Sequence, residues 1–185
     1  MGLLYVVRHA ETEYNNKGIY VGRKDISINK KGINQANYVG KRLKKENVNL
    51  IVTSSLTRAK ETANIINKYL KKDIIIDDRF DEVDIGVYEG LTSREISETI
   101  RNRHHGDIYE FYNNNFLEGE KNRDVEERIY QGLENIKKNY PDERIALITH
   151  GFIIRVINKY FNPNIPFPNF FNFLVKNAEI KKFHF

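Results

Sequence analysis

Short apolar runs recur along the chain, and each is followed at once by polar residues. The first covers residues 3–7 and gives way to Arg8 and His9, and three more lie at residues 50–53, 74–76 and 144–149. These runs are far shorter than the roughly 18 apolar residues of a membrane helix. They are typical of strands buried on both faces of a sheet.

Between these runs, apolar residues recur at every third or fourth position, which is the spacing of helices with one buried face. Helices are predicted over about 30–46, 56–70, 92–101, 122–139 and 151–160. Asn29 is a suitable N-cap for the first of them. The inner face of that helix is expected to carry Ile33, Ala36, Val39 or Gly40, and Leu43.

The last part of the chain is predicted to hold a loop and two more strands. Prolines cluster in residues 162–168, where the loop is expected. Strands are predicted over 170–175 and 179–185, joined by a turn at Asn177-Ala178. The stretch 92–121, which is largely polar in its second half, is expected to be a variable insert or lid.

Strands that alternate with helices predict an α/β fold, here a three-layer α/β/α sandwich around a central, mainly parallel sheet. The late pair of strands allows one antiparallel member. The sequence shows no internal repeat and no linker, so residues 1–185 are expected to form a single domain.

Composition narrows the class of protein. With 40% hydrophobic and 12% aromatic residues, the 185-residue chain has the composition of a soluble globular protein. It contains no cysteine, which excludes disulfides, thiolate metal sites and cysteine nucleophiles. No membrane span or cleavable leader is recognisable, so a cytoplasmic protein is expected.

The net charge of +5 comes from basic residues scattered in pairs among acidic ones. This pattern favours solvated helix faces over a nucleic-acid surface, because no stripe of basic and aromatic residues stands out. The positive excess would still help to attract an anionic substrate.

Three predicted strands are followed by side chains that could take part in catalysis or anion binding. His9 and His150 each follow a strand, and the strand at 50–53 leads through two serines to Arg58. Each alone is more often structural, but the carboxyl ends of parallel strands share one edge of a sheet, where ligands bind. Two imidazoles and two guanidiniums, one of them from Arg8, would then meet. Burying so much positive charge is costly unless an anion compensates it, and a phosphoryl group matches arginine forks.

The residues around these positions form a series of motifs. Arg8-His9-Ala10-Glu11-Thr12, followed by Asn15, resembles the RHG-x-T-x-x-N signature of the histidine phosphatase superfamily, also called phosphoglycerate-mutase-like. Ala10, Ile28 and Tyr88 replace the family's commoner glycine, leucine and tryptophan, and none of them is a reacting group. The resemblance continues through Val21-Gly22, 32–36, 54–63, 80–90, Gly119-Glu120 with Val125 and Arg128, and Thr149-His150-Gly151 with Arg155.

The resemblance implies a two-step phosphoryl transfer. It gives His9 the role of the nucleophile that forms a phosphohistidine, while Arg8, Arg58 and His150 clamp the phosphoryl oxygens. It makes Glu82 the acid that protonates the leaving oxygen and then activates water. Asp81 and Asp84 are the alternatives to Glu82 in the same loop. The residues expected to bind the substrate are Asn15, Val21, Gly22 and Gly151.

The resemblance implies neither a metal nor another cofactor. His104 and His105 lack an accompanying carboxylate cluster or the His-Glu-x-x-His spacing, so they are expected to be surface or lid residues. The usual signatures of serine hydrolases and of nucleoside triphosphatases are also missing.

The implied function is that of a metal-independent phosphomonoesterase acting on a small phosphorylated metabolite, such as α-ribazole phosphate or a sugar phosphate. One alternative is a phosphoglycerate mutase, an isomerase, although the mutases that the chain resembles have a longer middle insertion than residues 101–118. Another is a phosphate-binding module without turnover, against which the complete set of site residues argues. The sequence leaves the physiological substrate and the oligomeric state open.

Overall fold

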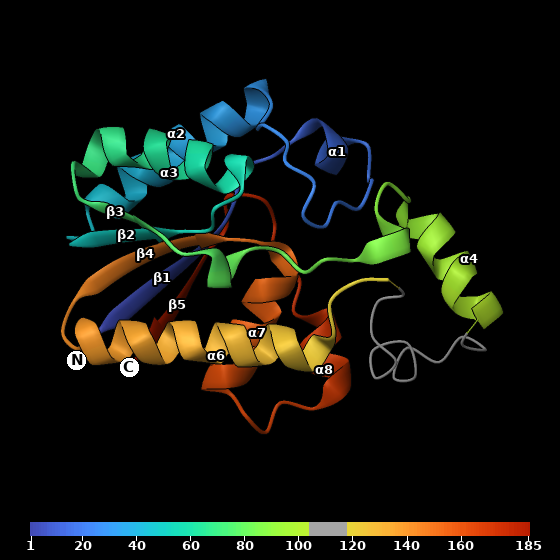
Figure 1. Cartoon of the computed structure of the whole chain (residues 1–185). Helices are drawn as coiled ribbons and strands as arrows, with labels where there is room; N and C mark the ends of the chain where they lie inside the picture. The colour runs from blue at the N-terminus through green and yellow to red at the C-terminus, as the bar shows by residue number, and fades with distance from the viewer. Residues whose placement is uncertain (104–117) are drawn as a thin grey trace.

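The computed structural model describes residues 1–103 and 118–185, which build a five-stranded sheet between helices (Figure 1). Four strands run parallel, and the last runs antiparallel to the first, as predicted for the late strand. His104 and His105 lie outside the described residues, as does the rest of the stretch 104–117 within the predicted insert. In the order β3-β2-β4-β1-β5, the strands are β1 (Leu3–Arg8), β2 (Leu50–Thr53), β3 (Ile74–Ile76), β4 (Arg144–Thr149) and β5 (Ile180–His184).

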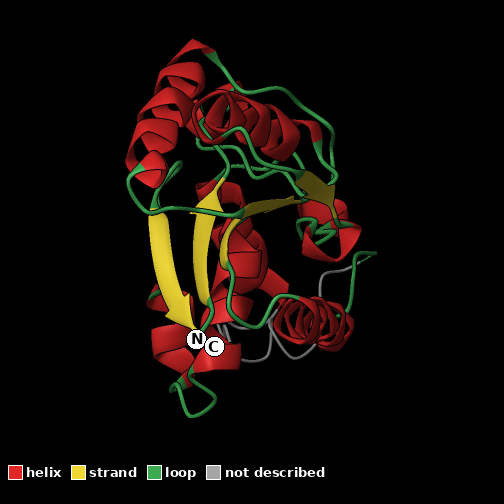
Figure 2. Cartoon of the chain, turned by 90° about the vertical axis from the view of Figure 1, so that its left-hand side faces the viewer, coloured by secondary structure: helices red, strands yellow, loops and turns green. Residues whose placement is uncertain are grey.

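Helices cover both faces of this sheet, so the predicted α/β/α sandwich is confirmed (Figure 2). One face is covered by α2 (Lys30–Lys44) and α3 (Thr57–Leu70), and the other by α6 (Asn122–Asn139), α7 (Gly151–Phe161) and α8 (Phe167–Asn172). Side chains alternate along the strands between two apolar cores. In β1, Leu4 and Val6 join the core under α6 and α7, while Tyr5 and Val7 join the one under α2 and α3.

Shorter elements complete the described part of the chain: α1 (Glu13–Asn16), η1 (Asp78–Phe80), η2 (Gly86–Tyr88) and α4 (Ser93–Arg103). α4 lies within the predicted insert and corresponds to the helix expected near 92–101. Among the described residues, no helix is long and apolar enough to cross a membrane.

The start of α2 follows the prediction, but its inner face does not follow it fully. The Asn29 side chain caps the helix by accepting a hydrogen bond from the Gly32 amide at 2.8 Å. Ile33 is 44% exposed, so its predicted place in the core is wrong. Gly32 lies on the buried face instead. A side chain has no room there, since a Cβ would approach the Glu11 carbonyl oxygen to 2.3 Å. The other buried residues of this face are Ala36, Val39, Gly40 and Leu43.

The strand predicted over 170–175 is wrong, because α8 occupies its first residues and the expected loop ends earlier. Pro166 lies at the N-cap of this helix, where its missing N–H costs nothing. Phe167, Phe170 and Phe171 contact one another at helical spacing, and Phe170 is only 3% exposed. The aromatic pattern therefore has the helical period, although phenylalanine also favours strands.

The sheet register brings three strand ends to one edge. Arg8 is paired with Thr149, and Thr53 with Ile148, so β1, β4 and β2 end almost level. Gly132 lets α6 come close to the loop that follows β3, since a Cβ there would lie 2.7 Å from the ring of Phe80. The residues that follow these strands, and those of this loop, therefore lie near the same edge of the sheet.

Candidate active site

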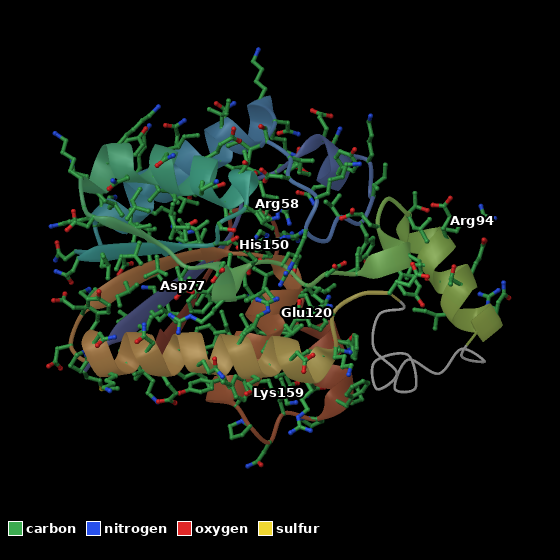
Figure 3. All side chains as sticks on the ribbon, in the orientation of Figure 1. Arg58, Asp77, Arg94, Glu120, His150 and Lys159 are labelled. Atoms are coloured by element: carbon green, nitrogen blue, oxygen red, sulfur yellow. The ribbon has the colours of Figure 1, made fainter. Side chains whose placement is uncertain are left out.

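Two histidines and a buried arginine meet at the carboxyl edge of the sheet. The rings of His9 and His150 lie 5.2 Å apart between centroids and are tilted by 55°. Arg58, from the first turn of α3, donates a hydrogen bond from Nε to His150 Nδ1 at 3.3 Å, and Figure 3 shows the two side chains next to each other. His9 is 4% exposed and Arg58 2%, so this group of side chains lies inside the protein.

The ring of His9 is held in one tautomer. Its Nδ1 lies 2.8 Å from the carbonyl oxygen of Ala10, which can only accept, so Nδ1 carries the proton and Nε2 keeps its lone pair. Burial, together with Arg58 and Arg8, lowers the pKa of His9 well below its usual 6.5. His9 is therefore neutral at neutral pH and available as a nucleophile.

Arg58 is fixed by neutral groups rather than by a carboxylate. Its Nη1 donates to the carbonyl oxygen of Lys24 at 2.9 Å, and its Nη2 donates to that of Gly22 at 2.8 Å. No carboxylate of the described residues forms an ion pair with it. Desolvation by burial lowers its pKa, as expected for a cation without a direct counter-ion.

Arg8 has a hydrogen-bond donor, its Nε, that is not used by the described residues. Its Nη1 donates to the carbonyl oxygen of Val175 at 2.8 Å, but its buried Nε has no hydrogen-bond partner among the described residues. A buried N–H without an acceptor is costly. Together with Arg58, it makes the space at this edge a site where an anion would be stabilised.

Glu82 lies in the loop between η1 and η2 and faces the same cations. Burial raises the pKa of this carboxyl, against the opposing effects of Arg58, Arg8 and the backbone amides of Val83 and Phe152. A carboxyl with a raised pKa keeps its proton to higher pH and is suited to donate it.

The two other acidic residues of this loop are bound elsewhere. Asp81 accepts hydrogen bonds from Ser54 Oγ, Ser55 Oγ and the Ser55 amide, each at 2.7 Å. Asp84 is exposed and accepts from the Gly86 amide at 2.9 Å. Of the three candidates for the acid, Glu82 is the one whose charge acts on both Arg8 and Arg58.

The predicted substrate-binding residues lie in different settings. Gly151 starts α7 beside Arg8, since a Cβ there would be 3.5 Å from the guanidinium. Asn15 lies at the start of the chain's first helix and accepts from Asn177 Nδ2 at 3.0 Å. Val21 is half-buried next to Gly22, whose amide donates to Glu89 and whose carbonyl accepts from Arg58.

Arg155 was not among the predicted site residues, yet it belongs to this region. It is half-buried on α7, lies over the ring of Phe171, and forms no ion pair with a carboxylate of residues 1–103 or 118–185. Its charge interacts with Glu82 and with Tyr20, and it lowers the pKa of Arg8. Its place in the Thr-His-Gly-x-x-x-Arg motif was the signal in the sequence.

A segment from late in the chain closes the loop that carries His9. The side chain of Asn177 donates to the His9 carbonyl oxygen at 3.1 Å, and the Ala178 amide donates to that of Arg8 at 3.0 Å. Together with the hydrogen bond from Arg8 to Val175, these contacts fix His9 and its neighbour Arg8 through the segment that precedes β5.

No group of three or more histidine, cysteine, aspartate or glutamate residues in the described part of the chain is arranged to hold a metal ion.

Comparison with known proteins shows that the chain is similar to phosphatases and to phosphoglycerate mutase-like proteins. A family model described as histidine phosphatase superfamily (branch 1) matches residues 4–185. The chain is 34% identical over 157 residues to "Uncharacterized phosphatase PhoE" of Bacillus subtilis, covering 85% of this chain and 76% of that protein. It is 29% identical over 154 residues to phosphoserine phosphatase 1 of Hydrogenobacter thermophilus, covering 83% and 73%. A protein of Escherichia coli named "Probable phosphoglycerate mutase GpmB" is 30% identical over 151 residues, covering 82% and 70%.

Solved structures share the fold. A mycobacterial glucosyl-3-phosphoglycerate phosphatase superposes with a TM-score of 0.84 over 97% of this chain and 88% of its own, at 24% identity. The α-ribazole phosphatase of Shigella flexneri superposes with a TM-score of 0.83 over 97% and 89%, at 19% identity. The arrangement of sheet and helices described above is thus common to these proteins.

Proposed function

Because this chain belongs to the histidine phosphatase superfamily (branch 1) and is thus an enzyme of the phosphatase type, we propose that it hydrolyses small phosphomonoesters through a phosphohistidine on His9. The observation that carries the proposal is the state of His9. Its ring is neutral, its Nε2 is unprotonated, and it lies next to His150 and close enough to Arg8 and Arg58 for both cations to lower its pKa.

In the first step, His9 Nε2 attacks phosphorus as the ester P–O bond breaks. The proton of Glu82 passes to the leaving oxygen, so that an alcohol rather than an alkoxide departs. Nδ1–H stays bonded to the Ala10 carbonyl, which stabilises the positive charge that the ring acquires. Arg8 and Arg58 stabilise the negative charge on the transferred group, which is the main contribution a protein makes to phosphoryl transfer.

In the second step, water attacks the phosphohistidine. Glu82, now ionised, takes a proton from that water, the P–N bond breaks, and His9 Nε2 recovers its lone pair. Each step needs only groups that the described residues supply. We therefore propose a reaction without a metal ion, which a chelator tests directly.

We also propose that the substrate carries a second anionic group near its phosphate. Arg155 supports this, because its half-buried guanidinium acts on Arg8 and Glu82 and has no carboxylate partner of its own in the described residues. Phosphoserine, the substrate in the name of one relative, has a carboxylate at such a position. A simple sugar phosphate lacks one, and α-ribazole phosphate is a bulkier alternative without a carboxylate.

The test is release of inorganic phosphate, first from an aryl phosphate ester and then from a panel of phosphorylated metabolites. The panel contains phosphoserine, 3-phosphoglycerate, α-ribazole phosphate and a sugar phosphate. We expect turnover of the aryl ester, which a phosphate-binding module without catalysis would not show. Turnover should persist in a chelator, and a loss that added metal restores would contradict the metal-free mechanism.

The mutase alternative is tested with 3-phosphoglycerate in the same panel. A phosphatase releases free phosphate, whereas a mutase returns 2-phosphoglycerate and must shield the phosphohistidine from water. We expect free phosphate to be the main product. Isomerised product in excess of phosphate would favour the mutase.

A further inference from the structure

The second histidine of the site is the end of a buried chain of hydrogen bonds. His150 Nε2 lies 2.7 Å from Ser54 Oγ, and Ser54 Oγ lies 2.7 Å from Asp81 Oδ1. Ser54 and His150 are fully buried, and Asp81 nearly so. The three residues come from the ends of β2 and β4 and from the loop after η1, so only the folded chain brings them together.

The direction of each hydrogen bond follows from the groups involved. An ionised carboxylate can only accept, so the single hydroxyl proton of Ser54 is directed to Asp81. Ser54 Oγ must then accept from His150, which places a proton on His150 Nε2. On the other side of the ring, Arg58 Nε can only donate, so His150 Nδ1 must hold a lone pair. Two independent contacts thus assign the same neutral tautomer.

This tautomer has a consequence for anion binding. Nε2 is bound to Ser54, which leaves Nδ1, on the side of Arg58, as the ring nitrogen that could bind an anion. In the neutral ring Nδ1 has no proton to donate, and its lone pair would repel a phosphoryl oxygen. His150 can bind such an oxygen only after Nδ1 has been protonated and the ring has become a cation.

We propose that Ser54, anchored by Asp81, is a positioning residue that holds His150 so that capture of a phosphoryl dianion takes up one proton from solvent onto His150 Nδ1. The inference rests on the proposed function, because it concerns the phosphate site of that reaction. A hydronium ion of the solvent gives up the proton that forms the N–H bond at Nδ1, and the hydrogen bond that Arg58 Nε donates to Nδ1 is released. The new N–H then donates to the bound anion. Ser54 then accepts from an imidazolium, for which a charged hydrogen bond is stronger.

Several other ionisable groups face the ring. Arg58, His9, Arg8 and Arg128 all lower the pKa of His150, after burial as the main cause. Glu82 faces the same cations and could also take up a proton when an anion binds. A measurement that resolves single side chains is therefore required.

Sulfate is a suitable probe, because it stays a dianion over the pH range of interest and cannot supply the proton itself. Nitrogen NMR of the protein labelled with ¹⁵N-histidine reports the tautomer and charge of each ring, and His150→Gln identifies the signals of His150. At pH 7, we expect the free ring to be neutral with its proton on Nε2. With saturating sulfate, both nitrogens should carry protons.

The affinity for sulfate gives a second measurement, made in a Glu82→Gln background to remove the competing carboxyl. If one proton is taken up, the affinity should rise about tenfold for each unit by which the pH falls, over the range between the free and bound pKa values of His150. Ser54→Ala should weaken sulfate binding about tenfold and flatten this slope, since the imidazolium loses its acceptor.

Ser55→Ala is the matched control. Ser55 donates to the same carboxylate but does not contact His150, so this variant should change affinity less than threefold and keep the slope. Equal losses in the two serine variants would overturn the role of Ser54. A free ring with its proton on Nδ1, a ring that stays neutral with sulfate bound, or no sulfate binding by the unaltered protein would overturn the proposal.

The two proposals fail in different ways. Hydrolysis of an aryl ester by a protein whose His150 stays neutral would overturn this inference and leave the phosphatase reaction intact. Protonation of His150 without hydrolysis of any ester would do the reverse. Should Ser54→Ala fail to fold, the NMR measurement on the unaltered sequence still decides the question.

Discussion

The Nε atom of Arg128 lies 2.7 Å from Glu120 Oε1, and this pair ties α6 to the residues that follow the predicted insert. The same guanidinium donates from Nη2 to the carbonyl oxygen of Glu82 at 3.4 Å and from Nη1 to that of Asp81 at 2.8 Å. Glu120 is also bound to the loop directly, since its amide donates to the Asp84 carbonyl oxygen at 2.9 Å. The loop that carries Glu82 is thus held by Arg128 and its partner Glu120, and Arg23 adds hydrogen bonds to the Glu82 carbonyl oxygen at 3.2 Å and to Glu120 at 3.3 Å.

Replacing Arg128 should therefore impair acid catalysis more than binding. In Arg128→Lys, the fork that spans the loop is lost, and we expect kcat for esters with poor leaving groups to fall roughly 10- to 100-fold. Esters with good leaving groups should lose less, because they need little protonation. Arg123→Lys, at an exposed position on the same helix, is the control. Equal losses for both kinds of ester would show that Arg128 supports the fold and not Glu82.

His9→Ala should abolish turnover, because it removes the ring nitrogen that we propose attacks phosphorus. Brief incubation with a ³²P-labelled ester should leave acid-labile label on the unaltered protein and none on the variant. His184→Ala, which changes an exposed histidine at the end of β5, should retain the label. Label that survives in His9→Ala would assign the nucleophile to another residue.

Glu82→Gln should separate substrates by their leaving groups. The amide cannot donate a proton as an acid, so kcat for alkyl phosphates should fall by roughly 100-fold or more, with a smaller loss for a nitrophenyl ester. Burial raises the pKa of Glu82, so the protonated form persists to higher pH than for an exposed glutamate. The alkaline limb of the pH profile for alkyl phosphates should therefore disappear in the variant. Its persistence would assign that limb to another group.

Acid should destabilise the fold through the two buried histidines. The pKa values of His9 and His150 are well below 6.5 in the folded protein, so the unfolded chain binds more protons once the pH falls below about 6.5. Their contribution to stability is complete above that pH and is lost as the pH falls toward the folded pKa values. Each group contributes a slope of up to about 1.4 kcal/mol per pH unit.

Denaturant titrations between pH 7 and pH 5 measure this slope, and the double variant His9→Gln with His150→Gln is the reference. As the pH falls, the unfolding free energy of the unaltered protein should decrease relative to that of the double variant. Glu82 acts in the opposite sense, because its raised pKa adds stability as it becomes protonated, but it is present in both proteins. A difference that does not change with pH would contradict the shifts of the two histidines.

Arg155 should decide which esters bind well. Arg155→Met removes the cation but keeps an apolar side chain against Phe171, and we expect KM for phosphoserine or 3-phosphoglycerate to rise about tenfold. The nitrophenyl ester, which has no second anionic group, should be affected less than threefold, and Arg155→Lys should restore part of the loss. A uniform rise in KM would argue that Arg155 only shapes the pocket.

Local pattern was sufficient to predict much of the architecture. Each of these predictions depended only on neighbouring residues: the apolar runs of β1, β2 and β4, the Asn29 cap, and the regular spacing of apolar residues in α6. Each element was found at or near its predicted place. Because parallel strands end at a shared edge, these predictions also indicated which side chains could meet. One antiparallel strand was also expected from the late apolar pattern, but its pairing with β1 was not predicted.

What the pattern missed depends on contacts between distant parts of the chain. The aromatic residues of α8 fit a strand as well as a helix until their packing on one another is known. Ser54 and His150 are 96 positions apart, so nothing local indicates that they form a hydrogen bond. Arg155 was visible in its motif, but its half-buried position without an ion pair to any carboxylate of the described residues could be known only from the structure.

The contacts that Asn177 makes with the loop of His9 span 168 positions, which sets the order in which the site can mature. A ribosome therefore makes His9 long before it makes the side chain that holds the His9 carbonyl oxygen. Contacts of such long range also form late when a chain refolds. Until then the loop of His9 lacks the hydrogen bonds from Asn177 and Ala178, so the geometry of the site depends on long-range packing and not on local folding around His9 alone.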